Sequence, residues 1–538
     1  MIGMNRKSSS PGLKDVPELM HHIQSLLPVK EAARTGVLSK SWLHAWSTIP
    51  NLRFHEHMKL ADVDRSLVRY LRDDIPIERF ELKIDIQNQK SAALAQKWIR
   101  SVATKTSLKE LSLTISPSGA SLHLPEELLS GENLIKITVS ASQGPKPNSI
   151  WMTTTHHPKC VTSLRELHFS CVTVSEQVLH DIFSSCSSLV KIELILCSQG
   201  LNTIKVKNLH CLRQLQIVTS DGGSTAFEIS HLKSLRMLGC NVRMNGRSKR
   251  LSIPPLINGH SISLGSGVTE LTLGGGMIMD DASLDMIVKL GLPFLESLTL
   301  NMACWTRASF PFTSASIKRF SLLGCTSRLV DLVYVNAPKL LLFSFSGKIM
   351  PCFVFPYSTL EQIEFRLRFD IDRLDVSFFL KMRESLRLSS KCRVHITTFS
   401  YNLPMPLVDI YDLRRKLRFP PATNVQQLLF ETTGDECMWE SSPFFDAFFE
   451  ICHPDHVSAR PDSMLKHKNH FCKLIVMEVL EKNMNKTTTT SYWPHYLKNV
   501  QIERPHNKKW ETLTDSDTSF LEKLAPEHVP VQFKLNWW

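Results

Sequence analysis

The sequence predicts an α/β protein in which an N-terminal three-helix unit is followed by an irregular solenoid of short repeats and a C-terminal α+β capping region. Two observations support this prediction. A compact Leu- and Trp-rich segment at residues 14–55 has helical periodicity and helix-ending residues. Twelve similar apolar segments follow over residues 75–370, and the pattern fades over residues 371–538. These three ranges are the expected domains.

The first helix of the N-terminal unit is predicted between two prolines. Pro17 suits a first helical turn, because its fixed φ and missing N–H cost nothing there. One helical face then carries recurring apolar residues, which are Leu19, Ile23, Leu26 and Leu27. Pro28 stops the helix, because a proline ring clashes with the preceding turn. The sequence therefore predicts an amphipathic helix between Pro17 and Pro28.

Two shorter helices are predicted next. Lys30–Thr35 can form a helix that Gly36 ends. Ser39 can cap a third helix, which carries Trp42 and Trp46 one turn apart. A unit of roughly 40 residues is marginal as an isolated domain. We therefore expect the unit to bury its apolar surface against a partner.

Each repeat begins with the pattern L-x-x-L-x-L. The last two apolar positions alternate, so both point to one face of a short strand. The mean interval of about 25 residues resembles that of leucine-rich repeats, which run ~20–29 residues. Stacked repeats bury their apolar sides together and form a parallel sheet, with helices or irregular turns as the return segments. The first apolar residues are Ile77, Leu108, Leu134, Leu164, Leu189, Leu212, Leu235, Val268, Leu295, Ile317, Leu340 and Leu360.

Local features of the array allow sharper predictions. Val174–Ser185 is the clearest return helix, with Ser175 as its N-cap. Cys197 and Cys325 each lie eight residues after a repeat's first apolar residue, where a small buried side chain is expected. The longest interval contains residues 243–263, which we interpret as an inserted surface loop.

The pattern fades after Phe369. Lys391–Phe399 and Val425–Phe430 are predicted strands, whereas Pro443–Ile451 and Cys472–Lys482 are predicted apolar helices or core segments. We expect this region to close the far end of the array.

Composition points away from secretion and from a membrane. No window approaches the ~18 consecutive apolar residues of a membrane span. The N-terminus has no apolar signal region, and the thirteen cysteines form no C-x-x-C pair. We therefore expect a cytoplasmic or nuclear protein that has no disulfide framework. The net charge of +12 includes clusters at Arg243–Arg250 and Arg414–Arg418, interpreted as solvated loop faces, so nucleic acid is an unlikely partner.

Motifs of catalysis are not found. Cys452–His456 is the densest run of potential metal ligands, but it has no second pair at zinc-site spacing and is interpreted as a surface turn. Gly274–Gly276 does not continue as a phosphate-binding loop. We expect no catalytic residue, no cofactor and no metal.

Three short motifs resemble the F-box of plant F-box/leucine-rich-repeat proteins. They are Leu26-Leu27-Pro28, then Val37-Leu38-Ser39-Lys40-x-Trp42, and finally Ile49-Pro50-Asn51-Leu52, in the order and at the spacing of that family. In that family the F-box docks on the Skp adaptor of a Skp–cullin–F-box ubiquitin ligase, and the repeats hold a protein substrate. The resemblance implies a non-catalytic adaptor whose F-box lies at 14–55, and Trp493–Val500 resembles the family's FBD-like tail. The implied adaptor-binding residues are Pro17, Leu19, Ile23, Leu27, Pro28, Val37, Leu38, Ser39 and Trp42.

Other interpretations stay open. The stretch Pro17–Ile23 is one residue shorter than the usual opening of the family, which would rotate the first turn of the helix. The three helices could instead cap the exposed first repeat. The chain would then be a leucine-rich-repeat scaffold or binding module without a ligase role. Nucleic-acid binding through the two basic clusters is a third possibility, and an enzyme is the least expected class.

Overall fold

The computed structural model has a mixed α/β fold in which strands predominate. The chain divides into two compact units, residues 1–247 with 254–267 (unit 1) and residues 248–253 with 268–538 (unit 2), and each is described by itself. None of the helices described is long and apolar enough to cross a membrane. The structure describes residues 17–27, 29–55, 58–129, 131–141, 150–152, 163–197, 203–207, 209–220, 226–232, 235, 237–243, 262–264, 268–279, 293–305, 308–325, 330–357, 360–370, 375–399, 408–433, 444–460, 496–503, 509–512 and 531–538.

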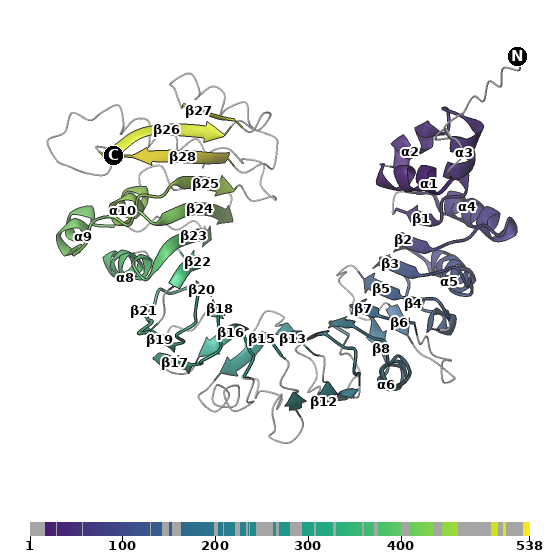
Figure 1. Cartoon of the computed structure of the whole chain (residues 1–538), viewed down its shortest axis with the longest axis horizontal. Coiled ribbons are helices and arrows are strands. Elements are labelled where there is room, and N and C mark those ends of the chain that lie inside the picture. Colours follow the sequence, from purple (N-terminus) through teal and green to yellow (C-terminus); the bar gives the residue numbers. More distant parts are fainter. Residues whose placement is uncertain are drawn as a thin grey trace, which may run out of the picture. The chain divides into compact units, whose positions relative to one another are not determined.

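Unit 1 begins with three short helices, α1 (Pro17–Leu26), α2 (Val29–Thr35) and α3 (Lys40–Ser47), which occupy the ranges predicted from sequence. We call residues 17–47 the helical unit. It lies at the β1 end of the sheet of unit 1, close to α4 (Leu60–Arg72) (Figure 1). One small or flexible side chain from each helix, Met20, Ala32 and Ala45, forms its buried centre.

The main sheet of unit 1 is parallel. Each strand pairs with the next strand of the set, so the repeats stack in chain order. Inward and outward side chains alternate along the strands, as in Arg79–Ile86, where the apolar residues are buried. The strands are β1 (Asn51–Phe54), β2 (Arg79–Ile86), β3 (Glu110–Pro117), β5 (Lys136–Ala141), β7 (Glu166–Ser170), β9 (Lys191–Ile195), β11 (Gln214–Ser220) and β13 (Met237–Arg243).

The first apolar residue of every predicted repeat is buried, from Ile77 to Leu360. In the repeats from Ile77 to Leu340 the strand begins two residues later. Cys197 and Cys325 are buried as expected, and the Cys197 thiol donates to the carbonyl oxygen of Phe169 at 3.4 Å. The inserted loop predicted at 243–263 lies largely outside the described residues.

The return segments differ from the prediction. Helix α6 (Glu176–Ser185) is present, and Ser175 caps it by accepting from the Val178 amide. Elsewhere the chain returns through short parallel strands as well as through helices such as α5 (Gln89–Ala103). Alternating apolar residues explain this, because a period of two favours a strand over a helix. The second layer of unit 1 contains β4 (Leu122–His123), β6 (Ile150–Met152), β8 (Thr173–Val174), β10 (Thr203–Lys207), β12 (Ala226–Leu232) and β14 (Ile262–Leu264).

Unit 2 repeats the same plan with an aromatic core. Phe320 stacks on Phe312, with ring centroids 4.8 Å apart, and contacts Phe343 at 5.8 Å. Its return strands are β17 (Ser309–Thr313), β19 (Leu332–Asn336) and β21 (Cys352–Val354). Its parallel strands are β15 (Glu270–Met279), β16 (Ser297–Trp305), β18 (Arg319–Cys325), β20 (Leu342–Gly347), β22 (Leu360–Asp370), β23 (Ser389–Phe399), β24 (Val425–Thr433) and β25 (His456–Arg460).

The C-terminal strands reverse the direction of the sheet. β28 (Val531–Trp537) pairs antiparallel with both β25 and β26 (Leu497–Glu503), and β27 (Trp510–Thr512) pairs antiparallel with β26. The predicted strands at Lys391–Phe399 and Val425–Phe430 are confirmed as parts of β23 and β24. Pro443–Ile451 contains helix α10 (Phe444–Ile451), and Cys472–Lys482 lies outside the described residues. Helices α8 (Val376–Leu386) and α9 (Ile410–Lys416) complete the unit.

Two sequence interpretations need correction. Cys452–His456 is not a simple surface turn, because Cys452 and Pro454 are buried. The Trp537 indole of β28 covers this segment, donating to the Pro454 carbonyl oxygen at 2.9 Å and stacking on the His453 ring. The Arg414–Arg418 cluster is not wholly a loop either, because its first three residues end α9.

Candidate adaptor-binding surface and adjoining cavity

A buried glutamine joins the three helices of the helical unit. Gln24 is only 1% exposed, and its Nε2 donates to Thr35 Oγ1 at 2.8 Å and to the Trp42 carbonyl oxygen at 3.1 Å. Met20, one turn earlier on α1, is also buried. Met20 and Gln24 therefore define the inward face of α1.

This orientation leaves apolar residues of α1 in contact with solvent. Leu19 and Leu27 are exposed, and Ile23 is half-buried. Leu26 is 72% exposed. The apolar positions identified from sequence thus form an outward surface, while a polar residue occupies the centre of the unit.

A tight turn between α2 and α3 adds two more apolar side chains to this surface. The Val37 amide donates to the Arg34 carbonyl oxygen at 3.1 Å, and the Leu38 amide donates to that of Thr35 at 3.0 Å. Ser39 then caps α3 by accepting from the Trp42 amide at 3.2 Å. Val37 is 90% exposed and Leu38 is 69% exposed, although backbone hydrogen bonds hold both in place.

The structure brings most of the predicted adaptor-binding residues onto one small helical unit. Leu19, Leu27, Val37 and Leu38 are exposed, whereas Ile23, Ser39 and Trp42 are half-buried. Pro17 is the first residue of α1, but its side chain lies outside the described residues, as does Pro28. Sequence reasoning did not name Leu26 and the exposed Leu43 as site residues. The helical periodicity of α1 includes Leu26. The α3 prediction depends on the spacing of the two tryptophans, which does not include Leu43.

Such a concentration of exposed apolar side chains is informative. Isolated exposed leucines are ordinary on protein surfaces, whereas contiguous apolar patches mark interaction sites. We call Leu19, Leu26, Leu27, Val37, Leu38 and Leu43 the apolar surface of the helical unit. It has the chemistry of a docking surface for a hydrophobic groove.

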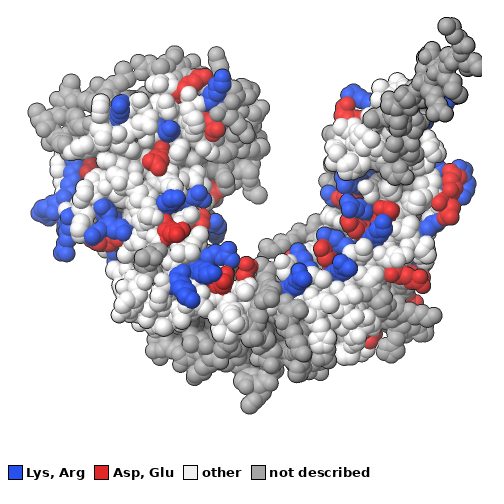
Figure 2. Space-filling view, in the orientation of Figure 1, with Lys and Arg blue, Asp and Glu red and all other residues white. Residues whose placement is uncertain are grey.

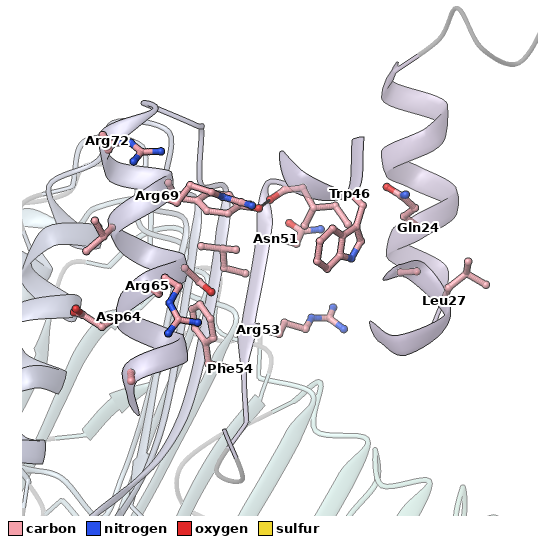
Figure 3. Close-up of a pocket in the computed structure, with 17 residues that line it drawn as sticks. Gln24, Leu27, Trp46, Asn51, Arg53, Phe54, Asp64, Arg65, Arg69 and Arg72 are labelled. Carbon is pink, nitrogen blue, oxygen red and sulfur yellow. Dashed lines mark hydrogen bonds between the residues drawn. The ribbon is translucent and has the colours of Figure 1, made fainter. Parts of the chain in front are cut away.

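A cavity of about 830 Å³ lies beside this unit, bounded by α1, α3, β1 and α4 (Figure 3). Trp46, Phe54 and Tyr70 contribute aromatic surface, and four arginines contribute positive charge. The Tyr70 hydroxyl donates to the Ile49 carbonyl oxygen at 3.0 Å, and burial raises the pKa of this phenol. Sequence reasoning missed the cavity, because its walls come from segments that no local pattern connects.

The exposed face of the parallel sheet in unit 1 carries a ladder of alternating charges. Residues at equivalent positions on neighbouring strands pair in register, and Figure 2 shows basic and acidic side chains interspersed over this part. Arg79 Nη2 lies 3.1 Å from Glu110 Oε1. Lys136 Nζ lies 2.8 Å from Glu166 Oε2. We call Arg79, Glu110, Lys136, Glu166 and Lys191 the charge ladder. The face is therefore polar and largely self-neutralised.

A second row of the same face holds a partly buried histidine–glutamate pair. His168 Nδ1 lies 2.7 Å from Glu193 Oε2, and Lys191 also contacts Glu193 at 2.9 Å. Burial raises the pKa of Glu193, but the hydrogen bonds from Lys191 and His168 outweigh it and hold the pKa below its usual range. Glu193 is thus an anion that Lys191 of the same strand neutralises and that His168 of β7 contacts.

Neither the basic cluster on α9 nor the Cys452–His456 segment forms an evident chemical site. Arg414 contacts Glu450 at 2.6 Å, and Lys416 contacts Asp412 at 2.6 Å, so acidic neighbours neutralise the cluster locally. Within the described ranges, no three His, Cys, Asp or Glu side chains gather closely enough to hold a metal ion.

The fold defines a class of protein: a parallel repeat array that carries a small three-helix unit with exposed apolar side chains. Comparisons with known proteins then show what the chain is similar to. A family model described as FBD-associated F-box protein At5g56370, LRR repeats, matches residues 95–256. Three relatives are from Arabidopsis thaliana. Putative F-box/LRR-repeat protein At3g59230 is 26% identical over 228 residues, which cover 35% of this chain and 45% of the relative.

F-box/LRR-repeat protein At5g02910 is 27% identical over 245 residues, covering 44% of this chain and 48% of the relative. Putative FBD-associated F-box protein At5g56410 is 25% identical over 194 residues, which cover 31% of this chain and 37% of the relative. The chain thus spans less than half the length of these relatives. These matches agree with the resemblance found in the sequence and show that the matched part of the chain is similar to plant F-box/leucine-rich-repeat proteins.

Proposed function

We propose that the protein is the substrate-recognition subunit of a Skp–cullin–F-box ubiquitin ligase. In this proposal residues 14–55 are the F-box, residues 75–370 are the leucine-rich-repeat solenoid, and residues 371–538 are the FBD-like capping region. The observation that carries it is the apolar surface of the helical unit, on which Val37 is 90% exposed and Leu38 is 69% exposed.

The energetics of this surface favour a bound partner. Burying a Val or Leu side chain stabilises a complex by roughly 1.5–3 kcal/mol, so a few such residues can supply most of a docking energy. Backbone hydrogen bonds already fix the turn that carries Val37 and Leu38, so little conformational entropy is lost on docking. A Skp-type adaptor with a hydrophobic groove is the partner that the family resemblance implies, and a cullin would bind through it.

The repeat array would hold the substrate. Its exposed strand face offers a polar surface on which ion pairs and hydrogen bonds can specify a protein ligand. Such an adaptor acts without catalytic residues, because holding the substrate near a ubiquitin-loaded enzyme raises the effective concentration of the acceptor lysine. We place this activity in the cytoplasm, the nucleus or both.

The test is co-purification of the full chain with a plant Skp-type adaptor. We expect a stable complex with the wild-type chain and none with the double variant Val37→Asp, Leu38→Asp. Leu341→Asp is the matched control, because it adds a charge at an exposed apolar position in unit 2. Circular dichroism must show that all three proteins are folded. If folded wild-type chain does not bind the adaptor, the protein is a leucine-rich-repeat binding module without a ligase role.

A further inference from the structure

The cavity beside the helical unit has an uneven charge distribution. Its lining includes Arg53, Arg65, Arg69 and Arg72, and Figure 3 shows Arg65 and Arg69 on the side of α4 that faces β1. Asp64 is the single acidic residue among the lining residues described. Its carboxylate already accepts from the Trp98 indole at 2.7 Å. The cavity is therefore a positively charged space.

Three of these arginines are paired with carboxylates at the protein surface. Arg53 Nε lies 3.6 Å from Glu81 Oε2. Arg65 Nη1 lies 3.3 Å from Asp62 Oδ1, and Arg72 Nε lies 2.8 Å from Asp73 Oδ1. All three guanidinium groups are largely exposed to solvent, and exposed ion pairs contribute little to stability. An anion that enters the cavity could recruit them at little cost to the fold.

The fourth arginine has an unused donor. Arg69 Nη2 donates to the Ser47 carbonyl oxygen at 2.6 Å, but its Nε is covered and has no hydrogen-bond partner among the residues described. Gln24 Oε1, in the opposite wall, is also covered and unpartnered. Because covered polar groups without partners are unfavourable, the lining has spare hydrogen-bonding capacity of both kinds.

Aromatic and aliphatic groups form the rest of the lining. Trp46 lies across the cavity from the arginines of α4, while Phe54 and Leu52 come from β1 (Figure 3). A volume of about 830 Å³ is within the ~300–1,000 Å³ of pockets that hold small molecules. Guanidinium groups match the planar geometry of carboxylate and phosphate oxygens and can bind them in a bidentate manner.

We propose that this cavity binds a small amphipathic oxyanion, a flat apolar body that carries one carboxylate or phosphate. The oxyanion lies among Arg53, Arg65 and Arg69, and the apolar body lies against Trp46 and Phe54. This site shares Leu27 alone with the apolar surface of the helical unit, and its proposed ligand does not depend on the proposed ligase role. Since its walls come from the helical unit, β1 and α4, an occupied cavity stabilises the packing of the helical unit on the first repeat.

The test is isothermal titration calorimetry of the full chain with four probes. Phenyl phosphate and phenylacetate carry both parts of the proposed ligand, inorganic phosphate has only the anion, and benzyl alcohol has only the apolar body. We expect phenyl phosphate or phenylacetate to bind at least tenfold more tightly than inorganic phosphate and benzyl alcohol. The preferred probe should also raise the thermal unfolding temperature of the chain.

Matched variants locate the binding. The double variant Arg53→Gln, Arg65→Gln should weaken the preferred probe at least tenfold. Val68→Glu should do the same, because it places an anion at an exposed position of the cavity lining. Arg100→Gln is the control: it removes an exposed arginine, paired with Glu127 at 2.9 Å, outside the cavity. The proposal is overturned if no probe binds the folded chain, if inorganic phosphate binds as tightly as phenyl phosphate, or if the control variant loses affinity equally.

Discussion

The side-chain amide of Gln24 donates to the backbone carbonyl oxygen of Trp42 at 3.1 Å and thereby joins α1 to α3 inside the helical unit. The same amide nitrogen donates to Thr35 Oγ1 of α2. One polar side chain therefore contacts all three helices, at a position where an apolar residue would pack without directional bonds.

We expect Gln24→Met to destabilise the helical unit by about 1–2 kcal/mol, because it removes two buried hydrogen bonds while keeping most of the side-chain volume. Hydrogen exchange of the α3 amides measures this loss. Gln214→Met is the matched control, since Gln214 is exposed on β11. Unchanged protection of α3 in the Gln24 variant would show that apolar packing alone holds the helices together.

Leu38→Ala should separate docking from folding. Leu38 is exposed, so its truncation should change the free energy of unfolding by no more than about 0.5 kcal/mol. If it anchors an adaptor, binding should weaken by about 1–3 kcal/mol, a five- to 150-fold rise in Kd. Surface plasmon resonance with a Skp-type adaptor measures this, and Leu341→Ala in unit 2 is the control. Equal effects of the two variants on binding would contradict the proposed surface.

Glu166→Lys should break the charge ladder. Glu166 accepts from Lys136 at 2.8 Å, and this hydrogen bond raises the pKa of the Lys136 ammonium. In the register of the sheet Glu166 also lies opposite Lys191, so the variant places three lysines in one row. Like charges on adjacent strands repel, and we expect a loss of about 1 kcal/mol in denaturant unfolding.

Salt should largely restore the stability of this variant, because the affected charges are exposed and an ionic strength near 1 M screens them within about 3 Å. Glu132→Lys, an exposed substitution outside the ladder, should change stability much less. A loss that persists unchanged in high salt would indicate a steric cause rather than charge repulsion.

Thiol reactivity should follow burial among the cysteines. Burial raises the pKa of the Cys197 thiol to about 12, whereas Cys211 is exposed. Since the thiolate is the reactive form, alkylation of native protein at pH 8 should label Cys211 and spare Cys197. Mass spectrometry of the peptides measures both sites at once. Rapid labelling of Cys197 in folded protein would contradict its buried position.

The His453 ring should make unit 2 sensitive to acid. It stacks on Trp537 with ring centroids 4.0 Å apart, and burial lowers its pKa to about 4. An unfolded histidine has a pKa near 6.5, so the unfolded chain binds more protons as the pH falls below that value. The contribution of the neutral His453 ring to the free energy of unfolding is constant above about pH 6.5. It is lost as the pH falls from about 6.5 to 4, and for a partly exposed ring we expect this loss to be about 1–2 kcal/mol.

His453→Phe keeps the stacked ring and removes the titrating group. We expect this variant to be less sensitive to pH between 6.5 and 4, measured as the change in unfolding midpoint with pH. His123→Phe controls for the loss of a histidine elsewhere, since His123 stacks on Trp151 in unit 1. An identical pH dependence of wild-type protein and the His453 variant would exclude this ring as the cause.

Several elements could be predicted because their signals are local. Ser39 and Ser175 cap the helices assigned to them, and the first apolar residue of each repeat is buried. The short parallel strands of the second layer were not predicted, since two or three alternating residues are too few to distinguish a strand from a turn. The candidate docking residues were named through family resemblance, and their role remains a prediction.

The sequence by itself determined where the strands of the main sheets and the capped helices form, because spacing of apolar residues and capping side chains act within a few residues. Only the tertiary structure decided which face of α1 points inward. The helical pattern favoured the leucines, yet Gln24 occupies the centre because its amide finds partners on two other helices. Likewise the charge ladder and the arginine-lined cavity depend on the register and packing of segments far apart in the chain, which no local pattern encodes.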